Sequence, residues 1–143
     1  SVGVKNGRVI CAGDPPAPLP TAYICEEYDT SGATISQHIP VSSNIVWGSC
    51  VCPVGSNWFV GSNRLSSGGI YRTVSKIGSM AYYDSGPGTL VYGIAPDAEG
   101  EHIFCVGLGG RNVGRIWKLS ADTLSLVKST DIDLGLNAIA RLP

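Results

Sequence analysis

The sequence has few charged residues. Only 15% of its 143 residues are charged and the net charge is −1, whereas about a quarter of the residues in an ordinary domain are charged. The strong basic excess of a nucleic-acid-binding domain is missing, so we expect no nucleic-acid partner. No apolar run approaches the roughly 20 residues of a membrane span, and no basic segment followed by an apolar run opens the chain. We therefore expect no membrane association and no signal peptide, and place the protein in the cytoplasm or in an assembled particle.

Metal-binding and redox spacings are also missing. The chain has an odd number of cysteines and no CxxC pair, and its two histidines, His38 and His102, are far apart in the sequence. A zinc site would need two ligand pairs. We therefore expect free thiols that act as small buried hydrophobes in a reducing compartment, with no metal and no cofactor. The cysteines are Cys11, Cys25, Cys50, Cys52 and Cys105.

Helical periodicity is the third absence, because no stretch keeps apolar residues on one face of a 3.6-residue helix. The chain instead has 19 glycines and 9 prolines, interspersed with Val, Ile and Tyr residues that favour strands. Glycine and proline favour tight turns between those strands. A chain of 143 residues is long enough for one domain with its own core. The composition therefore predicts a single all-β domain, 1–143.

An internal repeat of about 46 residues organises this pattern. Three short motifs recur in the same order at spacings of 45 to 48 residues. In the first two an apolar or aromatic pair precedes a glycine, and in the third an Ile-aromatic pair precedes a basic residue. They are Ile45-Val46-Trp47-Gly48 with Leu90-Val91-Tyr92-Gly93, Trp58-Phe59-Val60-Gly61 with Phe104-Cys105-Val106-Gly107 and Ile10-Cys11-Ala12-Gly13, and Ile70-Tyr71-Arg72 with Ile116-Trp117-Lys118.

Each repeat divides into four expected strands, A to D, separated by turn-forming residues. The third unit has strands at 90–95, 102–107, 115–119 and 124–129, and the second at 45–51, 57–61, 69–74 and 79–84. The first has strands only at 8–12, 22–28 and 34–39, with no strand A before them. Because 136–142 has the strand A pattern, we expect units at 136–143 plus 1–40, 41–86 and 87–132, the first being split between the two termini.

Four strands in a unit of 40 to 50 residues are typical of a β-propeller blade. The third unit resembles the blades of WD40-like, YVTN and quinoprotein-type propellers, in which strand A enters a Pro-Asp-x-x-Gly turn and strand C an Asp-x-x-Thr turn. Here the corresponding stretches are Gly93-Ile94-Ala95-Pro96-Asp97-Ala98-Glu99-Gly100 and Trp117-Lys118-Leu119-Ser120-Ala121-Asp122-Thr123. The Gly-His and Trp-Asp dipeptides of WD40 blades and the tryptophan-docking motif of quinoproteins are absent. The resemblance therefore implies the fold alone.

Three blades are too few to close a propeller, which has 4 to 8. The chain could form a dimer in which each C-terminal strand completes the partner's first blade, giving a six-bladed ring. It could instead be a fragment of a longer propeller, or belong to an assembly that covers its ends. We favour the homodimer, because a closed pair buries both exposed strand edges.

The candidate binding surface is the propeller face built by the B–C and D–A loops. Arginine binds carboxylate, phosphate or sulfate through two parallel hydrogen bonds, and asparagine suits sugar hydroxyls. The residues of these types that recur around the expected rim are Asn44, Asn63, Arg64, Arg111, Asn112 and Asn137.

No arrangement of catalytic residues is evident in the sequence. The two histidines fall in different units and at different strand positions, so no Ser-His-Asp arrangement is indicated. The leading hypothesis is a non-enzymatic, lectin-like binding module whose ligand is a carbohydrate or a protein. The alternatives are a structural component of a large assembly, such as a virus or phage particle, and a hydrolase or lyase on a propeller scaffold.

Overall fold

The structure is a computed structural model that describes residues 2–12, 25–38, 46–64, 67–74, 81–87, 89–109 and 113–132. These residues form twelve β-strands in three four-stranded antiparallel sheets. Each sheet is a simple meander in which strands consecutive in the sequence pair with one another. The prediction of an all-β fold is confirmed for this part of the chain. The same residues contain no helix that could cross a membrane.

The first sheet is short-stranded and has the order β1-β2-β3-β4. Its strands are β1 (Val2–Lys5), β2 (Arg8–Ala12), β3 (Cys25–Asp29) and β4 (Thr34–His38). β1 and β2 are joined by the turn residues Asn6 and Gly7, whose φ angles are 51° and 70°. Positive φ at both central residues defines a type I′ turn, whose twist matches that of a β-hairpin and which Asn-Gly favours. The local sequence thus specifies this hairpin.

The second sheet has longer strands in the order β5-β6-β7-β8. They are β5 (Val46–Val54), β6 (Asn57–Arg64), β7 (Ser67–Val74) and β8 (Ala81–Pro87). Gly55 and Ser56 make the β5–β6 turn, and Gly55 has φ of 57°. A glycine at the first central position is typical of a type II′ hairpin turn.

The third sheet has the order β12-β11-β10-β9. Its strands are β9 (Leu90–Pro96), β10 (His102–Leu108), β11 (Gly114–Ser120) and β12 (Leu126–Ile132). The expected strands of the second and third units all appear, most of them one to three residues longer.

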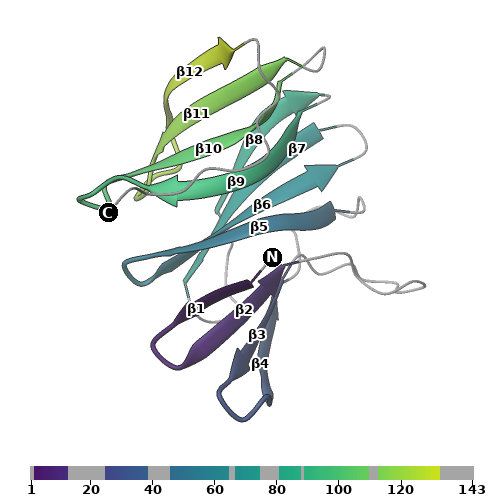
Figure 1. Cartoon of the computed structure of the whole chain (residues 1–143), viewed down its shortest axis with the longest axis vertical. Coiled ribbons are helices and arrows are strands. Elements are labelled where there is room, and N and C mark those ends of the chain that lie inside the picture. The colour runs from purple at the N-terminus through teal and green to yellow at the C-terminus, as the bar shows by residue number, and fades with distance from the viewer. Residues whose placement is uncertain are drawn as a thin grey trace.

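The three sheets follow one another like successive layers, with the first and third at opposite ends of the molecule (Figure 1). β1 and β2 contact β5, and β9 lies against β5, β6 and β7. The described strands form an open array rather than a closed ring.

The main core lies between the second and third sheets. Its largest fully buried side chains include Phe59 and Ile70 from the second sheet and Ile103, Trp117 and Leu119 from the third. Two polar contacts join the same sheets at their margins: the Ser49 hydroxyl donates to the main-chain oxygen of Val91, and Arg72 Nη1 donates to that of Ala121 over 3.3 Å. Burial of apolar side chains thus drives the packing of the second sheet against the third, and the two hydrogen bonds help to fix the relative orientation of these sheets.

The first sheet corrects one prediction. Strand A of the first unit was expected from 136–142 at the other end of the chain, but β1 occupies the position beside β2, with Val4 opposite Val9. The first unit is therefore not split, because it makes its own first hairpin around Asn6 and Gly7. Residues 136–143 lie outside the described part of the chain.

The alignment of the sequence repeat differs from the alignment of the strands in the second and third sheets. Gly93 lies opposite Val106 in the third sheet. The repeat aligns Val106 with Val60, which lies opposite Val51 in the second sheet. Gly48 is three residues before Val51, so the aligned glycines Gly48 and Gly93 do not occupy equivalent positions. The longer turn of the β9–β10 hairpin accounts for the shift, because extra turn residues move strand A along strand B.

Candidate functional site

The predicted rim is only partly described. Asn63 and Arg64 are the last two residues of β6, where they lie opposite Trp47 and Val46 of β5. They therefore belong to a strand ladder rather than to the expected loop. The other four predicted residues lie outside the described part of the chain: Asn44, Arg111, Asn112 and Asn137.

The positive charge of Arg115, near the start of β11, is neutralised by an acidic side chain. Arg115 makes two parallel hydrogen bonds to the carboxylate of Asp131, from Nε to Oδ1 and from Nη2 to Oδ2, the second over 2.9 Å. The hydrogen bonds from Arg115 lower the pKa of Asp131, and the same pairing raises the pKa of Arg115. Both residues are partly exposed. The pair links β11 to β12 and leaves no excess charge for a ligand.

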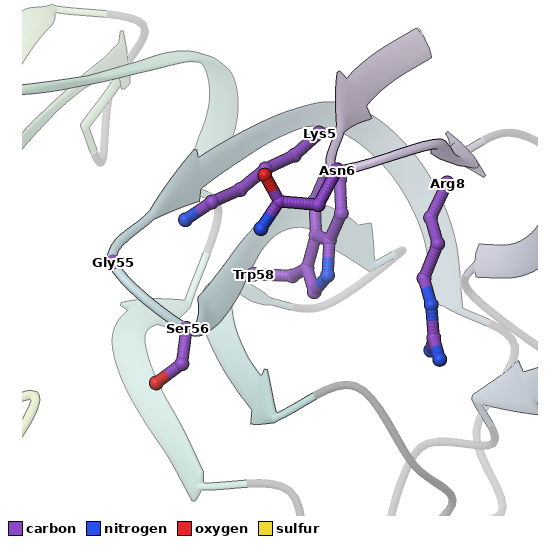
Figure 2. A pocket seen from close by; sticks show the side chains of 6 residues that line it. All are labelled: Lys5, Asn6, Arg8, Gly55, Ser56 and Trp58. Carbon is purple, nitrogen blue, oxygen red and sulfur yellow. The ribbon is translucent and has the colours of Figure 1, made fainter.

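A pocket lies at the opposite end of the sheets, where the β1–β2 and β5–β6 turns come together. Its volume is about 200 Å³, and its lining comes from both hairpins and from the indole beneath them (Figure 2). We call it the hairpin pocket. Its lining residues are Lys5, Asn6, Arg8, Gly55, Ser56 and Trp58.

Close packing of the first two sheets creates this pocket. A Cβ added to Gly3 would lie 3.1 Å from Cζ3 of Trp58 and 3.3 Å from Cγ1 of Val51. The absence of a side chain at Gly3 thus lets β1 approach the indole. Trp58 is only 3% exposed, and the side chains of Lys5 and Arg8 appear on either side of it in Figure 2.

Hydrogen-bond donors dominate the lining. Lysine and the tryptophan N–H can only donate, whereas asparagine and serine both donate and accept. Within the described part of the chain, the side chains of Lys5, Asn6, Ser56 and Trp58 make no hydrogen bond or ion pair. A buried tryptophan N–H usually has a partner, so the Trp58 N–H is the donor in this lining that lacks an expected partner among the described residues. No carboxylate lines it.

A second polar pair closes the β9–β10 hairpin. His102 Nδ1 lies 2.8 Å from Asp97 Oδ2, and the His102 main-chain N–H donates to Asp97 Oδ1 over 3.2 Å. Burial raises the pKa of Asp97, but the hydrogen bonds from His102 and Glu101 outweigh it, so the pKa is lowered overall. In the described residues no serine, threonine or cysteine hydrogen bonds to the His102 ring. An Asp-His pair occurs in catalytic triads, but here the nucleophile is missing among the described residues. Both contacts instead close the β9–β10 turn.

Three thiols meet in the core between the second and third sheets. We call Cys50, Cys52 and Cys105 the thiol cluster; all three are free and buried. Burial raises the pKa of Cys50 and of Cys52 to about 11, and burial beside these two raises that of Cys105 further above its ordinary value. Reactive and metal-binding cysteines are thiolates, so these protonated thiols act as small hydrophobes. No group of metal-ligating side chains occurs in the described residues.

The hairpin pocket was missed from the sequence, although part of the signal was present. Asn6-Gly7 between Val2–Lys5 and Arg8–Ala12 is a strong short-range hairpin signal, and it would have placed Lys5 and Arg8 side by side. Their approach to Trp58 depends on how two sheets pack, which the local pattern does not encode.

Comparisons with known proteins add no relative at this point: models of protein families, curated proteins and solved structures were each searched, and none matches the chain.

Proposed function

We propose that this protein is a non-enzymatic interaction module built from β-propeller-type blades, and that its first partner is a second copy of the same chain. Three consecutive four-stranded meanders, each packed on the next, support the propeller interpretation. The observation that carries the proposal is the outward face of the first sheet.

That face repeats a surface which the second sheet buries. The two hairpin turns align Lys5-Asn6-Gly7-Arg8 with Val54-Gly55-Ser56-Asn57, so Val2 corresponds to Val51. Val51 is half-buried and faces the first sheet beneath Gly3. Val2 and Val4 are 63% and 66% exposed, although Val51, the equivalent of Val2, lies between the first two sheets. A further sheet of the same kind is the surface that fits them.

The charges at the hairpin ends favour a second copy placed head to tail. The first hairpin carries Lys5 and Arg8, whereas the β9–β10 hairpin carries the exposed acids Glu99 and Glu101. If a second copy continued the array beyond the third sheet, its basic hairpin would lie beside this acidic one. Opposite charges at such a contact favour association and register. Two copies would supply six sheets, within the range of closed propellers.

The test is the mass of the full chain in solution, measured by light scattering at micromolar concentration. We expect twice the chain mass for the wild type and a monomer for the double variant Val2→Lys, Val4→Lys, because two buried lysines would lose hydration without a partner. The matched control is Thr30→Lys, an exposed turn residue of the same sheet, which should remain dimeric. Circular dichroism would verify that each variant keeps its strands.

Three results would overturn this assembly. A monomeric wild type would remove the second copy, and a dimeric double variant would place the contact elsewhere. A mass that grows with concentration without limit would mean that the ends join in an open series rather than a ring. That result would replace the closed dimer with the structural-component alternative, which the same exposed first-sheet face favours.

A further inference from the structure

The hairpin pocket has the properties of a ligand site rather than of a packing defect. A packing defect in a core is lined by apolar groups and stays dry. Here the side chains of Lys5, Asn6, Ser56 and Trp58 line the space, and none is engaged by another described residue. Trp58 is the buried member of this set, and a buried polar group without a partner in the chain is where a ligand or water is expected. Lys5, Asn6 and Ser56 are partly or fully open to solvent and accessible to the same ligand.

The charge of the lining restricts those acceptors. Lys5 and Arg8 both contribute positive charge, and no carboxylate lines the cavity. Arg8 has an interaction within the chain, so we count only its charge, while the Lys5 side chain has no hydrogen bond or ion pair with another described residue. A cation beside neutral donors suits an oxyanion, because ionised acceptors make hydrogen bonds about twice as strong as neutral ones.

The size of the cavity restricts the ligand further. A volume of about 200 Å³ is below the 300–1,000 Å³ of pockets for drug-sized molecules, but it equals several water molecules at about 30 Å³ each. The cavity therefore exceeds one bare carboxylate and takes a single small ring. The Asn6 amide and the Ser56 hydroxyl both donate and accept, which fits ring hydroxyls.

We propose that the hairpin pocket binds one acidic monosaccharide unit, a sugar ring bearing a carboxylate or a sulfate, with its oxyanion on the Lys5 ammonium and the Trp58 indole N–H. This inference deepens the binding role proposed above by naming a ligand class. Every lining residue comes from one chain, so the site is complete in a monomer.

The indole N–H signal of Trp58 in a ¹H–¹⁵N correlation spectrum provides a direct test. The chain has three tryptophans, and the variant Trp58→Phe identifies the signal. The full chain would be titrated with glucuronate, with glucose 6-sulfate, with glucose and with inorganic phosphate. We expect glucuronate or the sugar sulfate to shift the Trp58 signal in a saturable way, and glucose to leave it unchanged. The relative affinities of the two acids distinguish carboxylate from sulfate.

A charge variant tests the role assigned to Lys5. Lys5→Gln removes the charge and shortens the side chain but keeps a polar N–H donor, and we expect at least a tenfold loss of affinity for the acidic sugar. The matched control Lys128→Gln, at an exposed position of β12, should bind as the wild type does. Raising the salt concentration from 0.05 to 0.5 M should weaken binding to the wild type, because exposed charges are screened (the Debye length is about 10 Å at 0.1 M).

Each contrary outcome rejects a definite part of the proposal. If no acid shifts the Trp58 signal, the pocket is not an anion site. If inorganic phosphate binds as tightly as either acidic sugar, the ring contributes nothing and the sugar assignment is wrong. If a short polyaspartate peptide binds more tightly than the sugars, the ligand is an acidic peptide. A monomeric chain that still binds the sugar would reject the dimer alone.

Discussion

Gly107 is the position where the smallest change to the sequence should do the most damage. It lies opposite Val91, at the point where a β-bulge shifts the register of β9 against β10. A Cβ on Gly107 would overlap the main-chain oxygen of Leu90, and it would lie 2.8 Å from the Leu90 carbonyl carbon and 3.0 Å from Cα of Val91. Because these atoms are backbone, Gly107→Ala requires β9 to move away from β10.

Two other glycines provide a graded comparison. At Gly61 the added Cβ would meet side-chain atoms, including Cys50 Sγ at 2.5 Å and Val91 Cγ1 at 2.9 Å. At Gly109 the three nearest atoms all belong to the Arg115 side chain, with Nε at 2.9 Å, and a side chain shifts more easily than backbone, although the hydrogen bonds of Arg115 to Asp131 must then adjust. Overpacking a core costs about 1–3 kcal/mol. We expect about 3 kcal/mol or more at Gly107, an intermediate cost at Gly61 and about 0.5 kcal/mol or less at Gly109.

Urea unfolding of the three alanine variants measures this series. With a slope of about 2 kcal/mol per molar urea, the Gly107 variant should unfold at a midpoint about 1.5 M below the wild type. The Gly109 variant should stay within about 0.25 M of it. Equal midpoints for Gly107→Ala and the wild type would show that the two strands do not approach as closely as argued. A larger loss at Gly61 than at Gly107 would reject the distinction between backbone and side-chain obstacles.

Three further predictions concern the polar groups. Asp97→Asn should lower the urea midpoint at pH 7, because the hydrogen bonds that depress the Asp97 pKa stabilise the fold above the unfolded-state pKa of about 4. The difference from the wild type should shrink as the pH falls through the folded-state pKa, and a difference that stays constant at every acidic pH would contradict this. In a Cys11→Ser, Cys25→Ser variant, the thiol cluster should resist a thiol reagent at pH 8, since the pKa values of its three thiols are raised. The same thiols should react fully in urea. Rapid labelling of the thiols in the folded protein would mean that the core opens. Ser49→Ala removes a hydrogen bond between sheets and should lower the free energy of unfolding in urea by about 1 kcal/mol. An unchanged free energy of unfolding would contradict a stabilising role for that hydrogen bond.

Much of the secondary structure followed from local patterns. β6 and β10 were expected at 57–61 and 102–107 and lie at Asn57–Arg64 and His102–Leu108. Short apolar segments bounded by glycine, proline and aspartate favour strands and tight turns wherever they occur, so these predictions needed no knowledge of neighbours. The first hairpin was missed although its Asn6-Gly7 turn is a local signal of the same kind.

The predicted binding face stays a prediction. It was derived from the loops of a closed ring, and four of its six residues lie outside the described chain, while Asn63 and Arg64 extend a strand. The hairpin pocket lies at the other ends of the strands, where Lys5 and Trp58 both contribute to the lining. These two residues are 53 positions apart in the sequence. They come together only because Gly3 lets the first sheet pack against the second.

The sequence by itself determined the class of fold and most strand positions, because alternation, turn residues and repeat length act over a few neighbouring residues. Only the tertiary structure decided the strand register, the burial of the thiol cluster and the gathering of donors in the hairpin pocket. Register depends on turn lengths, and a slip of one residue turns every side chain to the other face. Burial and pockets depend on which sheets meet, so they are properties of the packed array and not of any one segment.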